Sequence, residues 1–258
     1  MTSARERDGH VVWVDLSTPD VARAIHFYER LFGWHYMERD TEMGLYVTAR
    51  VETGQVGGVM PQPPEQAAAG IPPAWTVLVG AGRLETVMAT ARELGGSVLQ
   101  TPLSIPGGAR VAVIADPAGA ALGMMDAPAP ESAMVWGYVG AVCWVECLSR
   151  DPVVARRFYE QLLGWTSEEG TGGYVVFSRG GERVGGLVAM PSSVPEQAPS
   201  HWLVYVAVAD VAVSCERAIA SGGTVLAPAH DIEEGRFAVL ADPAGATLAV
   251  FEELVPRS

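Results

Sequence analysis

Two carboxylates occupy the same place in two copies of one sequence pattern. Asp15 lies within Trp13–Ser17, and Glu146 lies 131 residues later within Trp144–Ser149. A carboxylate in an apolar cavity has a raised pKa, and it can then act as a general base or bind an amine or hydroxyl of a ligand. The alternative is a structural carboxylate that bonds a neighbouring strand or an arginine. Both interpretations depend on the elements that position the two side chains.

Tryptophans accompany these carboxylates in both copies. Six of the seven form pairs related by the repeat: Trp13 and Trp144, Trp34 and Trp165, Trp75 and Trp202. Strand alternation puts Trp13 and Trp144 on the face of Asp15 and Glu146. With Trp75 and Trp202 they would form flat, rigid walls for an aromatic ligand or a cation, unless they only fill the core. Further apolar candidates for the same cavity are Tyr46, Tyr174, Met60 and Met125.

Three polar side chains complete the candidate ligand-binding set. His201 stands before Trp202, and we expect it to face outward or to begin the strand. Arg110 and Arg236 each lie six residues before the aspartate of an Asp-Pro-Ala-Gly turn. They could bind a ligand anion or that aspartate. The other histidines lack metal-site spacing, and His230 falls in a predicted loop. No arrangement for covalent catalysis is present.

The composition excludes several classes of partner. The chain has 258 residues, of which 49% are hydrophobic and 18% charged, and its formal net charge is −13. Such an acidic protein is repelled by phosphate backbones and anionic lipid, so we expect neither nucleic acid nor membrane as a partner. The N-terminus lacks a signal-peptide pattern, and the odd cysteine count fits small core residues in a reducing cytoplasm.

The residues around Asp15 predict a β-α-β-β-β module. A strand over 11–16 leads to Thr18-Pro19-Asp20, which combines a capping hydroxyl, a proline at the first helical position and an acid near the positive end of the dipole. The helix ends at Gly33, because glycine accepts the left-handed conformation. Its apolar face is predicted from three- and four-residue spacing: Val21, Ile25, Tyr28 and Phe32. Three strands follow, over 34–38, 45–51 and 55–60.

The same pattern occurs four times. After a Pro-rich loop over 61–73, a strand over 75–79 and a helix over 84–94 precede three more strands, and residues 138–258 repeat the whole arrangement. We therefore predict an α+β protein with four βαβββ units in two tandem domains, over 1–126 and 138–258, joined by a linker over 127–137. Each domain would be a curved mixed sheet that cups a cavity, with its helices outside.

These motifs resemble the glyoxalase / bleomycin resistance / extradiol dioxygenase superfamily, also called vicinal oxygen chelate proteins. The resemblance rests on Phe27–Trp34, its copy Phe158–Trp165, and the two Asp-Pro-Ala-Gly-Ala turns. It implies a divalent metal in the cup, with ligands at four places in each domain. In this chain those places carry Trp13 and Trp144, Val77 and Val204, Gly123 and Ala249, and, near the fourth, Val59 and Leu187. None of these side chains can ligate a metal.

The function expected from the sequence is metal-independent binding of a small, largely aromatic molecule, as in the drug-sequestering members of this family. No cofactor is expected, and the protein would be a monomer or a homodimer. The alternative is a cofactor-independent isomerase, cyclase or lyase of secondary metabolism that uses Asp15 or Glu146 as general base. A metal-dependent glyoxalase or dioxygenase would require a different strand register.

Overall fold

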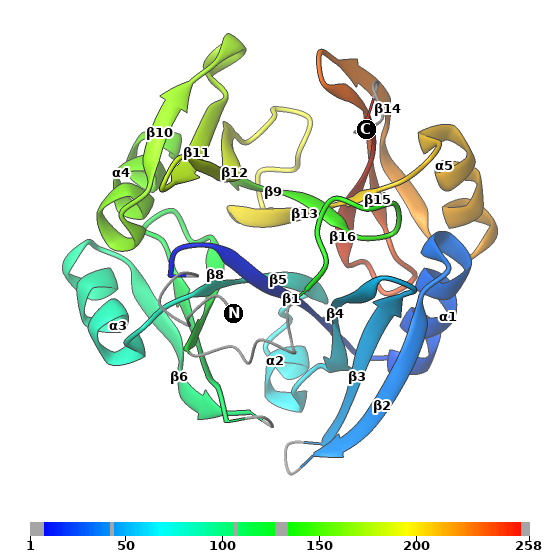
Figure 1. The fold of residues 1–258 in the computed structure, drawn as a ribbon, viewed down its shortest axis with the longest axis horizontal. Helices are drawn as coiled ribbons and strands as arrows, with labels where there is room; N and C mark the ends of the chain where they lie inside the picture. The colour runs from blue at the N-terminus through cyan, green and yellow to red at the C-terminus, as the bar shows by residue number, and fades with distance from the viewer. Residues whose placement is uncertain (1–7, 42–43, 106–107, 127–133, 254–258) are drawn as a thin grey trace. The chain divides into compact units, whose positions relative to one another are not determined.

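Four β-α-β-β-β modules follow one another in the computed structural model, which describes residues 8–41, 44–105, 108–126 and 134–253 (Figure 1). Modules 1 and 2 contain the following elements: β1 (Val11–Thr18), α1 (Val21–Phe32), β2 (His35–Thr41), β3 (Gly44–Val51), β4 (Gly54–Pro61); then β5 (Ala74–Gly80), α3 (Leu84–Glu93), β6 (Ser97–Ser104), β7 (Arg110–Ala115), β8 (Ala121–Asp126). A short helix, α2 (Pro64–Ala68), interrupts the predicted loop between them.

Modules 3 and 4 repeat this order. They contain the following elements: β9 (Val142–Ser149), α4 (Pro152–Leu163), β10 (Thr166–Glu169), the 3-10 turn η3 (Thr171–Gly173), β11 (Val175–Arg179), β12 (Glu182–Ala189); then β13 (His201–Ala207), α5 (Val211–Ala220), β14 (Thr224–Ile232), β15 (Gly235–Ala241), β16 (Thr247–Glu253). Within the described residues, no helix is both long and apolar enough to cross a membrane.

The strands form two mixed sheets of eight strands each. One has the order β2-β3-β4-β1-β5-β8-β7-β6, and the other has the matching order β10-β11-β12-β9-β13-β16-β15-β14. Within module 1, β4 runs parallel to β1 and places Gly58 opposite Asp15. Within module 3, β12 runs parallel to β9 and places Gly186 opposite Glu146. The predicted α+β class with repeated βαβββ units is confirmed.

The start of α1 differs from the prediction by two residues. Asp20, rather than Thr18, is the N-cap, and its carboxylate accepts a hydrogen bond of 2.9 Å from the backbone N–H of Arg23. The equivalent Asp151 caps α4 in the same way. A carboxylate caps an N-terminus as well as a hydroxyl does, so the acid took the capping role that we gave to the threonine. Gly33 ends α1 in the left-handed conformation, as predicted.

The buried face of α1 is also rotated from the predicted one. The fully covered residues are Ala24, Phe27, Tyr28 and Leu31, whereas Val21, Ile25 and Phe32 are only half-buried. Both sets have helical spacing, and they share Tyr28. The Phe-Tyr pair of the family motif therefore forms the packing face, and the aliphatic residues beside it lie at its margin.

Packing groups the modules differently from their order in the sequence. One compact unit comprises Met1–Trp13, Thr76–Ala133 and Trp144–Leu203, and thus most of modules 2 and 3. The other comprises Val14–Trp75, Met134–Cys143 and Val204–Ser258, and thus most of modules 1 and 4. Each unit therefore combines one module from each half of the sequence. The predicted boundaries at 126 and 138, which follow the repeat, stay a prediction.

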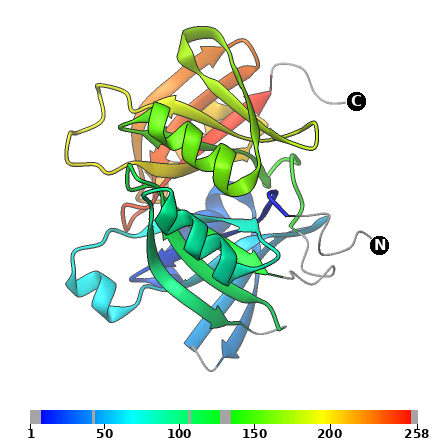
Figure 2. The same ribbon diagram turned by 90° about the vertical axis from the view of Figure 1, so that its left-hand side faces the viewer.

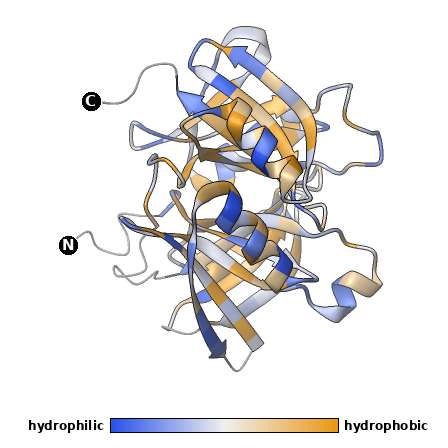
Figure 3. Ribbon diagram, turned by 90° about the vertical axis from the view of Figure 1, so that its right-hand side faces the viewer, coloured by the Kyte–Doolittle hydropathy of each residue, from blue (hydrophilic) through white to orange (hydrophobic). Residues whose placement is uncertain are grey.

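The helices of each unit lie against one another. In the unit of modules 2 and 3, α3 contacts α4, and Figure 2 shows the two helices side by side. In the unit of modules 1 and 4, α1 contacts α5. Figure 3, coloured by hydropathy, shows both hydrophobic and hydrophilic residues along α1 and α5, which fits one buried and one exposed face.

The same buried hydrogen-bond chain lies in the core of each unit. Trp75 Nε1–H donates to the Tyr28 hydroxyl at 3.0 Å, and that hydroxyl donates to Asp242 Oδ2 at 3.1 Å. In the other unit the corresponding chain runs from Trp202 to Tyr159 (3.0 Å) and on to Asp116 (3.0 Å). The family tyrosine of one module thus binds the turn aspartate of a module from the other half of the sequence.

Burial fixes the charge states within these chains. Burial raises the pKa of Tyr28, and the nearby Asp242 adds to the effect. Burial likewise raises the pKa of Tyr159, with smaller contributions from Cys147 and Asp116. Both phenols are therefore protonated at neutral pH and remain donors. Burial also raises the pKa of Asp116, although the backbone N–H of Ala120 and the Tyr159 hydroxyl oppose that shift.

Candidate functional site

In module 1, a tyrosine reaches across one strand to the candidate carboxylate on the next. The Tyr46 hydroxyl on β3 donates to Asp15 Oδ1 on β1 at 2.7 Å. Gly58 on the intervening β4 makes this contact possible, because a Cβ there would lie 2.0 Å from the Tyr46 hydroxyl and 2.2 Å from Asp15 Oδ1. The structure therefore brings together two of the predicted site residues over a glycine.

Module 3 also places a tyrosine over a glycine, and here an indole is a hydrogen-bond partner of the tyrosine. The Tyr174 hydroxyl lies over Gly186, where a Cβ would approach it to 2.0 Å. It accepts a hydrogen bond of 2.7 Å from Trp144 Nε1–H. Glu146 is opposite Gly186 in the register of β9 and β12, as Asp15 is opposite Gly58. Trp144, Glu146 and Tyr174 are all half-buried, so the predicted residues of this module are partly accessible.

The glycine before each of these glycines packs toward the other face of the sheet. A Cβ at Gly57 would lie 2.9 Å from Val14 Cγ2 and 3.6 Å from the Trp75 ring. At Gly185 the corresponding atoms belong to Val145 and Trp202. We did not predict this role of the Gly-Gly pair from the sequence. The signal was its recurrence at the same strand position in both halves, where glycine marks a close approach of neighbouring groups.

Trp75 and Trp202 do not line the face that carries the carboxylates. Both are buried, and each packs edge to face on the buried tyrosine of its unit, with ring centroids 5.5 Å apart for Trp75 and Tyr28 and 5.3 Å apart for Trp202 and Tyr159. Our prediction of their orientation is therefore wrong. Their indole N–H groups need a buried acceptor, and the tyrosine hydroxyls supply it on the helix-packed side.

This correction also changes which residues of β5 lie on the face of the carboxylates. Val77 shares the helix-packed face with Trp75, because alternate residues of a strand point to the same side. The residues on the other face are Thr76 and Leu78, which lie close to the position of a Cβ at Gly123, with Leu78 Cγ at 2.7 Å. In β13 the corresponding face carries Leu203 and Tyr205, rather than Val204.

The two candidate arginines are paired with acids other than the turn aspartates. Arg110 bonds Asp126 through Nε at 2.8 Å and Glu85 through Nη1 at 2.6 Å. Arg236 bonds Asp231 through Nε at 2.6 Å. The alternative in which each arginine binds its turn aspartate is therefore wrong. Arg110 lies opposite Asp126 in the pairing of β7 and β8, and Arg236 lies opposite Asp231 in the pairing of β14 and β15, so each arginine meets an acid on the adjacent strand. A ligand anion would have to compete with those acids.

The remaining predicted residues lie apart from these pairs. His201 begins β13, and its Nδ1 is 2.9 Å from the carbonyl of Pro199. Met60 is half-buried and Met125 is 7% exposed. Trp13 is 6% exposed and lies two residues before Asp15 in β1. Cys147, at the position of Leu16 in the repeat, is fully buried beside Tyr159, as expected for a core cysteine.

Module 4 presents aromatic side chains that the sequence analysis did not select. Tyr205 and Phe237 have ring centroids 6.0 Å apart, and His230 lies edge to face on Phe237 at 5.8 Å. His230 is in β14, not in a loop as predicted, and it pairs with Phe237 of β15.

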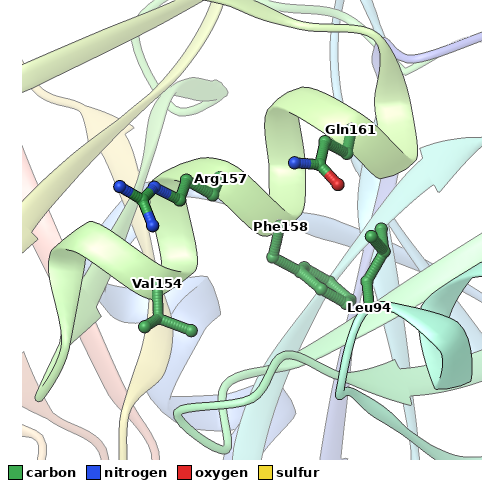
Figure 4. Close-up of a pocket in the computed structure, with 5 residues that line it drawn as sticks. All are labelled: Leu94, Val154, Arg157, Phe158 and Gln161. Carbon is green, nitrogen blue, oxygen red and sulfur yellow. The ribbon is translucent and has the colours of Figure 1, made fainter.

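A small pocket of about 250 Å³ lies on the helical surface of the unit of modules 2 and 3. It is lined by Leu94, Val154, Arg157, Phe158 and Gln161. Figure 4 shows Phe158 pointing from α4 toward Leu94. None of the residues that we predicted for the site lines it.

The resemblance implies a metal, but the residues present do not fit one. The implied positions carry side chains without donor atoms, and Val77 points to the helix-packed face. Over the described residues, no three His, Cys, Asp or Glu side chains are grouped so that they could hold a metal ion. The donor chemistry of the chain therefore disagrees with the metal chemistry of the resemblance.

Comparison with known proteins connects this architecture to a family. The glyoxalase/bleomycin resistance protein/dioxygenase superfamily model matches residues 9–124, and the glyoxalase-like domain model matches residues 144–251. The chain is 36% identical over 253 residues to the putative glyoxylase CFP32 of Mycobacterium tuberculosis, covering 95% of each. It is 34% identical over 258 residues to the anthracycline biosynthesis protein DnrV of Streptomyces peucetius, covering 95% of this chain and 93% of the relative.

Solved structures of low sequence identity share the fold. The Mn(II)-bound glyoxalase from Novosphingobium aromaticivorans has a TM-score of 0.65 at 14% identity, covering 96% of this chain and 83% of that one. The 2,3-dioxygenase LapB from Pseudomonas sp. KL28 has a TM-score of 0.62 at 11% identity, covering 96% and 93%. Both the sequence relatives and the fold agree with the motifs and the repeat. The chain belongs to the glyoxalase/bleomycin resistance protein/dioxygenase superfamily.

Proposed function

We propose that this protein binds a small, planar, largely aromatic molecule without a metal ion. The observation that carries the proposal is the character of the sheet face opposite the helices. In modules 1 and 3 this face holds tyrosine hydroxyls over glycines, beside a carboxylate or an indole, and the residues described there form no metal donor set. Flat aromatic surfaces with a few placed polar groups suit a ligand with fused rings and hydroxyl or carbonyl substituents.

The relatives support the chemical class of this ligand. Anthracyclines are polycyclic aromatic compounds with hydroxyl and quinone groups, and DnrV is a relative named for their biosynthesis. Tyr46 and Tyr174 could hydrogen-bond to such oxygens, since a phenol both donates and accepts. The carboxylate oxygens of Asp15 and Glu146 could accept hydrogen bonds from hydroxyl groups of the ligand. Binding of this kind needs no redox or Lewis-acid chemistry.

Direct binding of a defined probe tests the proposal. We would titrate the intact chain with 1,4-dihydroxyanthraquinone and follow tryptophan quenching together with the visible spectrum of the probe. We expect saturable binding and, by mass spectrometry, far less than one metal ion per chain after purification without chelator. About one tightly held metal ion per chain would refute the metal-independent part. Failure of the probe and of related hydroxylated polycyclic compounds to saturate would refute aromatic binding itself.

A second function is favoured by the contact between Tyr46 and Asp15. A carboxylate held at 2.7 Å by a phenol has a fixed orientation, as a general base requires. In this alternative the protein is a cofactor-independent isomerase, cyclase or lyase, with Asp15 or Glu146 removing a proton from an activated carbon. The phenol of Tyr46 would then donate to the developing enolate oxygen.

Isosteric variants separate the two functions. Asp15→Asn and Glu146→Gln keep the size and one acceptor oxygen but cannot remove a proton. A binding protein would keep its affinity for the probe to within about threefold in both variants. An enzyme would convert a hydroxylated polycyclic substrate to a product detectable by liquid chromatography with mass spectrometry, and one of these variants would abolish the conversion while still binding. Tyr46→Phe serves as a matched control for loss of the hydroxyl alone.

A further inference from the structure

Module 4 carries an aromatic wall on the less buried face of its sheet. We define the wall as Tyr205 on β13, His230 on β14 and Phe237 on β15. Alternate residues of β15 and β16 fall into two classes of burial. Ala238, Leu240, Leu248 and Val250 are fully buried, whereas Phe237, Val239 and Phe251 are half-buried. Within the wall, Phe237 is half-buried and His230 is exposed, whereas Tyr205 is buried, as is Ala249 on the same face.

A small residue on the central strand allows the rings of the wall to meet. Ala249 of β16 pairs with Tyr205 of β13 on one side and with Val239 of β15 on the other. A methyl group there leaves the tyrosine and Phe237 free to approach across β16, with their centroids 6.0 Å apart and their planes inclined by 56°. His230 continues the row, edge to face on Phe237. Three rings thus line one continuous surface.

Module 2 has an aliphatic surface at the equivalent positions. The register pairs Leu78 with Gly123, as it pairs Tyr205 with Ala249. It pairs Val111 with Met125, as it pairs Phe237 with Phe251. Each aromatic position of module 4 that we compare is therefore leucine, valine or methionine in module 2. The backbone pairing is the same, so the difference lies in the side chains alone.

We infer that the aromatic wall of module 4 selects planar aromatic ligands and that the equivalent surface of module 2 does not. This inference rests on the proposed function and deepens it, because it makes the two copies of the fold unequal in ligand choice. Phe237 and His230, as the more exposed members, would contact the ligand, and the largely covered Tyr205 would hold Phe237 in place. Edge-to-face and offset stacking favour aromatic over saturated ligands at such a surface.

Exchanging residues between the two surfaces tests the inference. The variants Tyr205→Leu and Phe237→Val give module 4 the residues of module 2, and the matched control variants are Leu78→Val and Val111→Ala in module 2. We would titrate each intact protein with 1,4-dihydroxyanthraquinone after checking its fold by circular dichroism. We expect Phe237→Val to weaken probe binding about tenfold and the module 2 variants to change it less than about twofold. Phe237→Leu, which keeps more of the volume, should also weaken binding.

The outcomes distinguish this inference from the proposed function. If the wild-type chain binds the probe and the module 4 variants bind it equally well, the inference is refuted while the proposed function stands. Equal or greater loss in the module 2 variants would also refute it. If the wild-type chain does not bind the probe at all, the proposed function fails and the inference falls with it. The reciprocal variant Val111→Phe should add affinity, and a second weak site there would support the inference directly.

Discussion

Replacing Gly58 by alanine should separate Tyr46 from Asp15. The added Cβ would lie 2.0 Å from the Tyr46 hydroxyl and 2.2 Å from Asp15 Oδ1, whereas real Cβ contacts stay beyond 3.0 Å. The hydroxyl must therefore move by about 1 Å or more, which carries it beyond hydrogen-bond range of the carboxylate unless that group follows. The contacts on the other face of β4 need not change, because they are made by Gly57 with Val14 and Trp75.

The expected loss follows from the contact that breaks. A hydrogen bond to a charged group contributes about 1.5–3 kcal/mol, and overpacking adds a similar amount when the surroundings are rigid. Asp15 and Tyr46 are both half-buried, so each can turn toward water and recover part of that energy. We therefore expect Gly58→Ala to lower the free energy of unfolding by about 1–2 kcal/mol. If the pair holds the ligand, affinity for the anthraquinone probe should fall as well.

Urea unfolding followed by tryptophan fluorescence measures the loss, and a double-mutant cycle assigns its cause. Tyr46→Ala removes the ring that blocks the new methyl group. In that background Gly58→Ala should cost less than half of what it costs in the wild type. An equal cost in both backgrounds would show that the tyrosine is not responsible, and the proposed role of Gly58 would be refuted. Gly186→Ala should behave in the same way with Tyr174.

Three further predictions concern the core. Tyr159→Phe leaves the indole N–H of Trp202 and the carboxyl of Asp116 without their shared partner, so urea unfolding should show a loss of roughly 3 kcal/mol; a loss below about 1 kcal/mol would contradict the buried chain. Burial raises the pKa of Asp116 in the folded state, so its contribution to stability is complete below about pH 4 and is lost as the pH rises through the raised value. The free energy of unfolding of the wild type minus that of Asp116→Asn should therefore fall from pH 3 toward pH 7, and a constant difference would contradict this. Finally, a protease site placed between residues 126 and 134 should give two halves that co-elute in gel filtration after cleavage, because each compact unit contains a module from each half; separate elution would refute that packing.

Much of the fold was predictable because it repeats. Constant spacing between Trp13–Trp34 and Trp144–Trp165 indicated two halves, and the order of predicted strands and helices within each half then indicated four modules. Gly33 and Gly164 both end their helices in the left-handed conformation. Strand bounds shifted by a few residues, which does not alter the order of elements. The helix cap was misplaced by two residues, because Asp20 is the cap instead of Thr18, and the buried helix face was misplaced by one residue.

The site was less predictable, because it depends on pairs of residues that are far apart in the sequence. Asp15 and Glu146 could be selected from their type and repetition. The contact between Tyr46 and Asp15, however, depends on Gly58 in the strand that lies between those two residues. The orientation of Trp75 depends on Tyr28, a partner 47 residues away. A shift of one residue in a strand turns every side chain to the other face, so the error in the orientation of Trp75 is also an error in the orientation of Val77.

The repeat explains why the sequence could not indicate which modules pack together. Tyr28 and Tyr159 occupy equivalent positions, and so do Asp116 and Asp242, so the pattern itself allows each tyrosine to bind either aspartate. The structure pairs Tyr28 with Asp242 and Tyr159 with Asp116, which joins one module of each half in each unit. These contacts join the two halves of the chain on the helix-packed side of the sheets. The opposite sheet faces take no part in them. One face carries tyrosine and phenylalanine where its copy carries leucine and valine, so the two copies can differ in ligand while they share the same core contacts.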